Sequence, residues 1–405
     1  MSGTVGAGWA VAAWANLVST SGEAMASTAT QAAERDDPAD WLRLIRSRRV
    51  GAVTFHRLMG EHGSARAALQ ALPELARAAG VEGYEVCPAG VAQAEIKAGR
   101  ASGAQLLLWG GPGYPAGLMD LADAPPVLWA RGDTGLLQRP MVALVGARNA
   151  SSLGLRMARR LAEGLGEAGQ VVVSGLARGI DAAAHEAALA TGTVAVMAGG
   201  VDVIYPEENA DLAAQIAAKG CLVAEHPPGL QPQTRHFPLR NRIISGLSRA
   251  VVVVEAAARS GSLITARDAA DQGREVLAVP GHPFDARAAG CNMLLRDGAT
   301  LVRHVGDVTE ALGLTRGAGP QTGAADPLAP EAGALPGPVP ARRTLGEMAD
   351  LHGQILARLG PSPLAEDQLI RDLAMPPSLL APALVSLELE GRILRAPGGL
   401  VSRAE

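Results

Sequence analysis

The stretch VALVGARNASSLG, residues 142–154, decides the fold. It begins with an unbroken apolar run, which is typical of a strand buried on both faces of a sheet. Gly146 permits a tight turn after that run, and Ser151 or Ser152 is a favoured cap for a helix that follows. The stretch therefore predicts a strand, a turn and a helix, which is the repeating unit of a parallel α/β sheet.

Six further apolar runs follow, and helical patterns separate most of them. Seven strands at this spacing predict an open, mostly parallel, doubly wound sheet of the Rossmann-like kind. Such sheets bind ligands beyond the carboxyl ends of their strands. The six runs are VVVSGLA (171–177), TVAVMAG (193–199), CLVAEH (221–226), AVVVVEA (250–256), EVLAVPG (275–281) and TLVR (300–303).

The sequence on either side of this sheet changes character. An Ala/Ser/Thr-rich start reads as a disordered extension, and a cap at Asp37 opens a series of short helical patterns. A Pro/Gly/Ala-rich linker comes before three more helical patterns and a Gly-Gly hairpin, the order of a winged helix. We therefore expect an extension (1–38), a helical domain (39–108), a Rossmann-like domain (109–316), a linker (317–342) and a winged helix (343–405).

Composition narrows the function classes. The 36 basic and 40 acidic residues give a net charge of −4, so any nucleic-acid contact must come from a local patch. The three cysteines are scattered, which argues against a disulfide frame or a zinc site and fits a reducing cytosol. No apolar run approaches the ~18 residues that a membrane helix needs, and no basic residue precedes the apolar N-terminal stretch as a signal peptide requires. We expect a cytoplasmic protein without a membrane segment or a metal.

A small positive segment stands out in this acidic chain. RHFPLRNR, residues 235–242, holds three arginines, a histidine and a phenylalanine but no acid. Arginines in the first turn of a helix oppose its dipole, a cost that a bound polyanion would offset. Arginine with an exposed ring at Phe237 is the combination that single strands require, charge for phosphates and a ring face for bases. The alternative, equally weighted on the segment alone, is a core Phe237 with arginines paired to Glu225 or Glu255.

Other strand ends carry glycine and polar residues. Gly175 and Gly179 let the backbone approach a ligand closely, and the turn after AVVVVEA could offer backbone N–H groups to an anion. Asp181 and His185 are four residues apart, which suits either a catalytic or metal pair or a structural hydrogen bond, although two ligands are too few for a metal. The turn after Gly146 lacks the G-x-G-x-x-G pattern, so it is either a phosphate cradle or a plain turn with an exposed arginine.

Taken together, these stretches resemble the DNA-processing protein A family, also called DprA or Smf. The resemblance runs over most of residues 110–312. The flanks resemble, more loosely, the helix-hairpin-helix or SAM-like domain and the winged helix of longer members. The matching stretches are YPAGL (114–118), APPVLWARG (124–132), VGARNASSLG (145–154), SGLARGIDAAAHEAAL (174–189), YPEEN (205–209), FPLRNRIISGLS (237–248), VVVVEAAARSGSLITARDAADQGREVLAVPG (251–281) and GCNMLLRDGATLV (290–302).

The resemblance implies a DNA-binding protein without catalysis or cofactor. Members bind single-stranded DNA, protect incoming DNA and help load the recombinase RecA onto it in natural transformation, and they commonly dimerise through the Rossmann-like domain. Their DNA pocket carries over onto the VGAR loop and the HFPLRNR stretch, with turn residues lining the cradle. The expected DNA-binding residues are Arg148, Ser174, Gly175, Arg235, Phe237, Arg240, Asn241, Arg242, Ser260 and Gly261.

Two departures from the family and two other functions bear on this expectation. Ala147 stands where members often have Ser, and Ala224 precedes Glu225 where Ser-Glu is common, so only hydroxyl contacts are in doubt. An enzyme similar to the lysine-decarboxylase-like phosphoribohydrolases would need a Gly-Gly-x-Gly-Thr signature, but Val201 and Asp202 follow Gly200. A duplex-DNA regulator acting through the winged helix would need a stronger basic face than residues 345–405 have.

Overall fold

A computed structural model describes residues 36–314, 345–396 and 399–404. Four helices form the first part: α2 (Pro38–Arg46), α3 (Ala52–His62), α4 (Ala65–Ala78) and α5 (Ala89–Ala101). The Asp37 side chain caps α2 by accepting a hydrogen bond from the Ala39 N–H group. Trp41 and Phe55 are fully buried with their ring centroids 5.1 Å apart, and they belong to one hydrophobic core that continues into the large sheet.

The middle of the chain forms a nine-stranded sheet in the order β1-β2-β6-β5-β4-β3-β7-β8-β9. The strands from β3 to β9 are parallel to their neighbours, while β1 and β2 form an antiparallel edge beside β6. The strands are β1 (Gln105–Leu108), β2 (Val127–Gly132), β3 (Met141–Gly146), β4 (Val171–Ser174), β5 (Thr193–Gly200), β6 (Cys221–His226), β7 (Ala250–Glu255), β8 (Glu275–Ala278) and β9 (Thr300–Leu301).

Helices cover both faces of this sheet, because the strands are apolar on both sides. Val142 and Leu144 of β3 pack in one core with α7, α8 and α13, whereas Ala143 and Val145 pack in the other with α10 and α11. The helices of this part are α6 (Ala116–Met119), α7 (Ser152–Glu167), α8 (Ile180–Ala188), α9 (Ala210–Lys219), α10 (His236–Leu247), α11 (Ser262–Asp271), α12 (Ala289–Arg296) and α13 (Val305–Ala311), with 3₁₀ turns at Thr134–Gln138 and Glu207–Asn209.

The strand order reverses beside β3. The chain runs outward from β3 through β4 and β5 to β6, then returns to place β7 on the other side of β3. The connection after β3 leads to α7 on one face, and the connection after β7 leads to α11 on the other. The two connections diverge at the carboxyl ends of the strands and leave a crevice there, the usual ligand position in doubly wound sheets.

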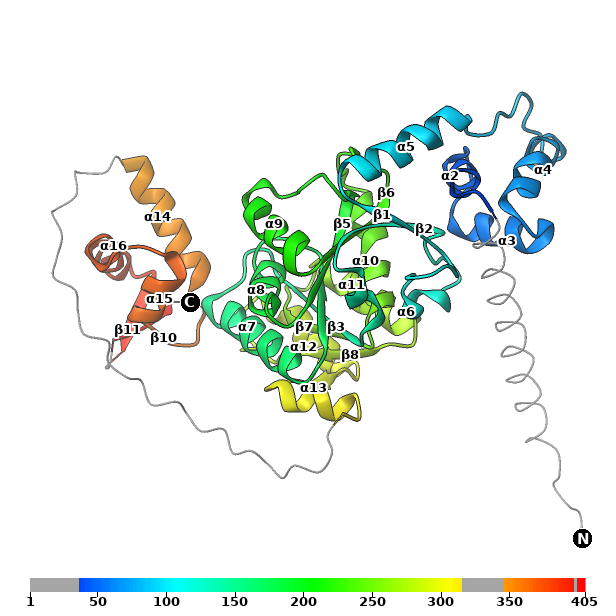
Figure 1. The fold of residues 1–405 in the computed structure, drawn as a ribbon. Coiled ribbons are helices and arrows are strands. Elements are labelled where there is room, and N and C mark those ends of the chain that lie inside the picture. The colour runs from blue at the N-terminus through cyan, green and yellow to red at the C-terminus, as the bar shows by residue number, and fades with distance from the viewer. Residues whose placement is uncertain (1–35, 315–344, 397–398, 405) are drawn as a thin grey trace, which may run out of the picture.

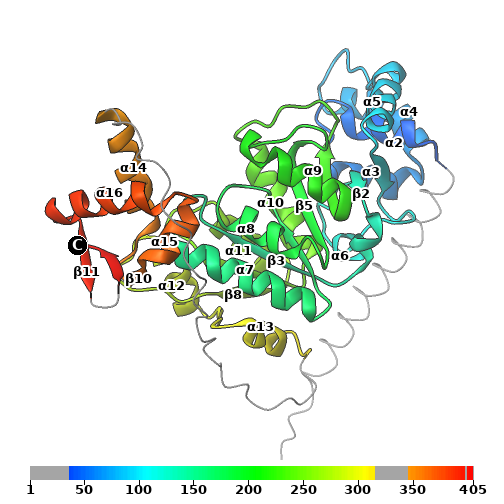
Figure 2. The same ribbon diagram turned by 60° about the vertical axis from the view of Figure 1, so that its left-hand side comes forward.

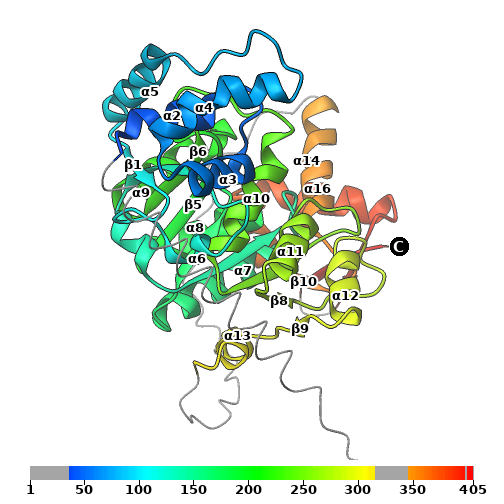
Figure 3. The same cartoon turned by 90° about the vertical axis from the view of Figure 1, so that its right-hand side faces the viewer.

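The last part is a winged helix with a separate hydrophobic core. It contains α14 (Leu345–Arg358), β10 (Leu364–Ala365), α15 (Glu366–Leu373), α16 (Pro377–Leu389), β11 (Ile393–Ala396) and β12 (Leu400–Arg403). Figures 1 and 2 show it in orange and red beside α7, at the opposite end of the molecule from the helical domain in blue. Figure 3 looks from the helical-domain side and has the winged helix behind.

The expected fold class is confirmed, but two strands of the nine-stranded sheet were missed, as was the two-residue β10 of the winged helix. All seven expected strands are present, as are the helical domain and the winged helix. The missed strands of the large sheet are β1 and β2, and β1 lies inside the stretch that we assigned to the helical domain, so the sheet begins before residue 109. The expected extension (1–38) and linker (317–342) lie outside the described residues almost entirely. Among the helices that the structure describes, none has both the length and the apolarity to cross a membrane.

Candidate nucleic-acid interface

A cleft of about 670 Å³ lies at the carboxyl ends of the strands, where the strand order reverses beside β3. We call it the switch-point cleft. Its walls are the loop after β3, the loop between β7 and α11, and the first turns of α10. Four arginines line it against one carboxylate, that of Asp181, so the cleft is cationic although the chain is acidic overall. The arginines are Arg148, Arg240, Arg259 and Arg287.

Arg148 and Phe237 meet across this cleft. The Arg148 guanidinium lies 5.3 Å from the centroid of the Phe237 ring, a cation–π contact between the VGAR loop and α10. Tyr205 also packs against Phe237, with ring centroids 5.6 Å apart, and is 51% exposed. Within the part of the chain that the structure describes, Arg148 has no carboxylate within 4.0 Å, so its charge is free to meet a phosphate.

Arg240 lies at the floor of the cleft rather than on its surface. It is 7% exposed, and its Nη1 donates to the carbonyl oxygens of Gly175 at 2.7 Å and Val196 at 2.5 Å. Burial lowers the pKa of Arg240 to about 10, although the nearby Asp181 carboxylate opposes that change. A Cβ atom on Gly175 would lie 2.3 Å from Arg240 Nη1, so Gly175 makes room for the guanidinium. Both residues therefore shape the cleft from below.

Arg242 is held in an ion-pair network. Its Nη2 donates to both carboxylate oxygens of Glu225, at 2.8 and 2.7 Å, and its Nη1 donates to the Asp123 carbonyl. Burial raises the pKa of Glu225, and the charge of Arg242 opposes that rise. This is the arginine–glutamate pairing that the segment alone left as the alternative. Arg242 does not line the cleft, so its main contact is structural.

The loop after β7 closes the other side of the cleft. Asn241 accepts a hydrogen bond from Arg240 Nε and donates to the Gly261 carbonyl, which joins α10 to the start of α11. The hydroxyls of Ser260 and Ser262 are hydrogen-bonded at 2.7 Å. Gly261 is exposed with open space around it. Together these residues form the polar rim expected of a cradle.

Besides Arg242, two more expected positions lie away from the cleft surface. Ser174 is fully buried, and its hydroxyl donates to the Leu144 carbonyl at 2.6 Å, so it is placed as part of the sheet and not of the cleft lining. Arg235 is exposed at the start of α10 next to His236 but does not line the cleft. The structure thus brings Arg148, Phe237, Arg240, Asn241, Ser260 and Gly261 together around one cleft.

Asp181 and His185 do not form a pair. The Asp181 carboxylate accepts from the backbone N–H groups of Gly175 and Ala177, while His185 Nδ1 lies 2.7 Å from Thr193 Oγ1. Burial and the charge of Arg240 lower the pKa of His185 to about 3. Both side chains make structural hydrogen bonds, the second of the two readings that their spacing allowed.

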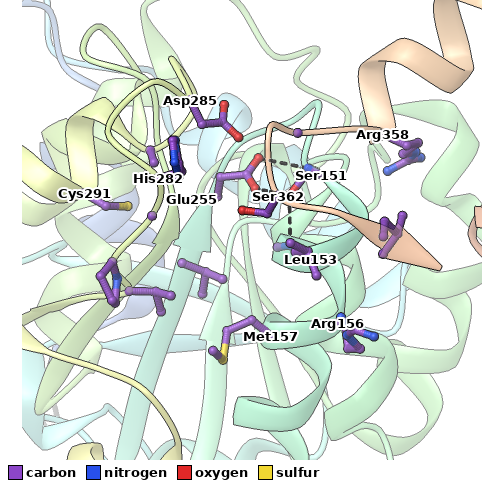
Figure 4. Close-up of a pocket in the computed structure, with 18 of the residues that line it drawn as sticks. Ser151, Leu153, Arg156, Met157, Glu255, His282, Asp285, Cys291, Arg358 and Ser362 are labelled. Atoms are coloured by element: carbon purple, nitrogen blue, oxygen red, sulfur yellow. Dashed lines mark hydrogen bonds between the residues drawn. The ribbon is translucent and has the colours of Figure 1, made fainter. Parts of the chain in front are cut away.

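The N-terminus of α7 already holds an anion from the protein itself. The Glu255 carboxylate accepts from the Ser151 N–H at 2.9 Å and from the Ser151 hydroxyl at 2.5 Å. Burial raises the pKa of Glu255, and the two hydrogen bonds from Ser151 oppose the rise. Figure 4 shows this contact in a second cavity, of about 540 Å³, with His282 and Asp285 on one side and Arg358 of the winged helix on the other. The turn after Gly146 therefore offers Arg148, not this helix N-terminus, to a ligand.

Sequence reasoning missed Tyr205, Arg259 and Arg287. Tyr205 stood in the quoted YPEEN stretch, and Arg259 in the turn after AVVVVEA, yet neither position has a local pattern that places it beside Phe237 or the cleft. Only the sheet order brings the loops after β3, β5 and β7 to one edge. An aromatic residue or an arginine in a loop at a strand's carboxyl end is the signal that would have found all three.

Fold and site together define a Rossmann-like α/β protein with a cationic, aromatic-lined cleft, a helical domain before it and a winged helix after it. The chain belongs to the DNA recombination-mediator protein A family, whose model matches residues 105–313. The flanking parts match the DprA-like N-terminal HHH domain over residues 35–98 and the DprA winged helix domain over residues 338–399. The resemblance stated from the motifs is confirmed.

Relatives with curated names agree with this assignment. The DNA processing protein DprA of Bacillus subtilis is 46% identical over 202 residues, which is 49% of this chain and 68% of that protein. The Escherichia coli protein Smf is 37% identical over 291 residues, 71% of this chain and 74% of that one. The crystal structure of DprA from Streptococcus pneumoniae aligns with a TM-score of 0.52 at 41% identity, covering 55% of this chain and 77% of that one.

Proposed function

We propose that the switch-point cleft binds single-stranded DNA. The observation that carries this proposal is the group of Arg148, Phe237 and Tyr205, in which an arginine without a carboxylate partner among the described residues lies over one ring and a second ring packs against the first. Single strands are bound by a charged groove for phosphates with aromatic rings for bases, and stacking contributes ~1–3 kcal/mol per base. The buried Arg240 supports the site from below with charge rather than by contact.

Binding is tested by the anisotropy of a labelled oligo-dT at two salt concentrations, with the annealed duplex as control. Arg148→Gln is expected to weaken binding and to reduce the slope of log K against log salt by ~0.7, the loss of one phosphate contact. Phe237→Leu is expected to weaken binding with an unchanged slope, because it removes a ring and no charge. Arg77→Gln, on the exposed surface of α4, is the matched control. Equal affinity for single strand and duplex contradicts the proposal.

We infer further that the bound strand is delivered to a recombinase of the RecA type. The family description as a recombination mediator supports this step. Filament assembly by RecA on a strand coated with single-strand-binding protein should be faster with the wild-type protein and should lose that gain with Arg148→Gln. An unchanged rate with wild-type protein would refute the step while leaving strand binding intact.

We also propose that the protein acts as a cytoplasmic homodimer that binds rather than transforms DNA. The resemblance to a family whose members commonly dimerise through the Rossmann-like domain supports the dimer. Light scattering across micromolar concentrations should give twice the chain mass, and labelled DNA should be recovered unaltered. A single monomeric mass would refute the dimer, and cleaved or modified DNA would refute the purely binding role.

A further inference from the structure

A third cavity, of about 940 Å³, joins the cleft to the winged helix. It shares Arg148, Phe237 and Arg240 with the switch-point cleft, so the two spaces are continuous around these residues. Its opposite wall comes from the winged helix, with Gln354 and Arg358 on α14 and Leu373 at the end of α15. The cavity is therefore open although the winged helix contacts the Rossmann-like domain, and its volume lies within the ~300–1,000 Å³ range of ligand sites.

The winged helix is held in place by hydrogen bonds at the C-terminus of α14. Arg287 donates to the carbonyl oxygens of Ala357 and Leu359, each at 2.7 Å, and is itself held by the Asp285 carboxylate. A cation at this position satisfies end carbonyls and complements the negative end of the helix dipole. In return, Arg358 donates to the Ala150 carbonyl at 3.1 Å, in the loop that carries Arg148. These contacts of Arg287 and Arg358, which we call the seat of the winged helix, fix Arg358 next to the cleft.

The charges facing this cavity call for an anion. Arg148 and Arg358 come from different domains and line the same space. Of the two carboxylates that line it, Glu208 is paired with Arg178, whereas Asp372 accepts a hydrogen bond, among the described residues, only from the neutral Gln368 amide and keeps its charge. Four arginines line the same cavity, so its lining is positive overall. Two like charges across a domain interface repel each other unless an anion lies between them. A phosphate backbone would supply that anion.

Resting on the proposed function of the cleft, we propose that the winged helix forms the second wall of the strand-binding site and that Arg358 binds the phosphates of the strand together with Arg148. The strand runs from the switch-point cleft into the cavity beneath α14. Leu373 presents an apolar surface there, and the Gln354 amide can donate or accept. Binding and seating are then linked, because a strand that contacts both domains stabilises the closed arrangement by the same free energy that closure adds to binding.

Removing the charge of Arg358 tests the contact in the full-length chain. Arg358→Gln is expected to weaken binding of oligo-dT about tenfold at low salt, as for a hydrogen bond to a charged group, and to lower the salt slope by ~0.7. The matched control is Arg392→Gln, which removes an exposed arginine of the same domain that lines none of the cavities described here. An unchanged slope for Arg358→Gln overturns the proposal.

A bulky uncharged side chain at the contact between the winged helix and the Rossmann-like domain tests whether the winged helix forms part of the binding site. A Cβ atom on Gly360 would lie 3.0 Å from Asp285 Oδ2 and 3.1 Å from Arg287 Nη2, so the larger side chain of Gly360→Leu is expected to push Asp285 and Arg287 aside and to weaken the contacts that hold the winged helix. Gly353→Leu adds the same side chain to α14 where nothing lies within 4 Å. A second wall predicts faster dissociation of oligo-dT from Gly360→Leu than from Gly353→Leu. Tighter binding by Gly360→Leu would instead make the winged helix a competitor of the strand and overturn the proposal.

The two proposals fail in different ways. If the wild-type protein does not bind oligo-dT, the proposed function fails. If the wild-type protein binds and loses affinity with Arg148→Gln but not with Arg358→Gln or Gly360→Leu, only the second wall fails.

Discussion

Gly175→Ala tests whether Arg240 is a structural part of the cleft floor. The new methyl group would lie 2.3 Å from Nη1, 2.5 Å from Cζ and 2.6 Å from Nη2 of Arg240. Gly175 does not have a positive φ, so the substitution brings no backbone strain of its own. The guanidinium must leave its position, and the free-energy cost of that movement is the quantity measured.

The expected loss of folding free energy follows from the hydrogen bonds that the Arg240 guanidinium would lose. Its Nη1 donates to the Gly175 and Val196 carbonyls, and a hydrogen bond to a charged group contributes ~1.5–3 kcal/mol. Each of the two bonds would be lost, and the buried Asp181 would also lose the opposing charge of Arg240. These losses overlap, so we expect a destabilisation of ~3–5 kcal/mol. In a domain of this size, that corresponds to a fall in Tm of roughly 6–20 °C.

The assay is thermal unfolding followed by circular dichroism, with Gly261→Ala as the control. Gly261 lies on the rim of the same cleft with nothing within 4 Å of a new Cβ, so its change should leave Tm nearly unaltered. In an Arg240→Met background the clash is gone, and the added cost of Gly175→Ala should fall by at least ~2 kcal/mol. A Tm within about 2 °C of the wild type, or the same cost in both backgrounds, would refute the role assigned to Arg240.

Three further outcomes are expected. Arg242→Gln should lower Tm but leave the salt slope of oligo-dT binding unchanged, because Arg242 is paired with Glu225; a smaller slope would contradict that assignment. Glu95→Gln should lower Tm and speed limited proteolysis of the helical domain, since Glu95 accepts from both Arg46 and the Trp129 indole; unchanged proteolysis would show that this contact does not hold the domain. Hydrogen bonding to Arg303 lowers the pKa of Asp307 to about 2, below its ordinary value of 3.8. Its stabilisation is therefore present above about pH 4 and lost as pH falls through 2, so the stability difference between wild type and Asp307→Asn should shrink below pH 4 and vanish only below about pH 2. A difference independent of pH would contradict that assignment.

The parallel strands could be predicted because their apolar runs are unbroken, and the antiparallel edge could not. β6 (Cys221–His226) has the bounds that its sequence predicted. β1 and β2 lie on either side of the Gly- and Pro-rich stretch 110–115, and β2 finds its partner in β6, some 90 residues further along the chain. Pairing over that distance depends on tertiary packing, which a local pattern does not contain.

The site was predicted in outline, and its arginines could have been sorted further. Ile243, Ile244 and Leu247 lie three, four and seven residues after Arg240, which is the spacing of one helix face. Because those three are buried, Arg240 had to face the interior, and it does. The partner of Arg242 is different in kind, since Glu225 lies on another strand and its position depends on the assembled sheet.

The turn between β3 and α7 also explains why the G-x-G-x-x-G pattern of dinucleotide-binding proteins is missing. In dinucleotide-binding folds, the N-terminus of the helix after the first strand receives a pyrophosphate. Here the Glu255 carboxylate fills that place, and a Cβ atom on Gly154 would lie 2.6 Å from Glu255 Oε2. The glycine therefore admits a carboxylate of the protein where other folds admit a phosphate. With that position closed, an incoming anion meets Arg148 and Arg259 instead, whose side chains are exposed along the cleft. Charges spread along a groove suit a chain of phosphates better than a single mononucleotide.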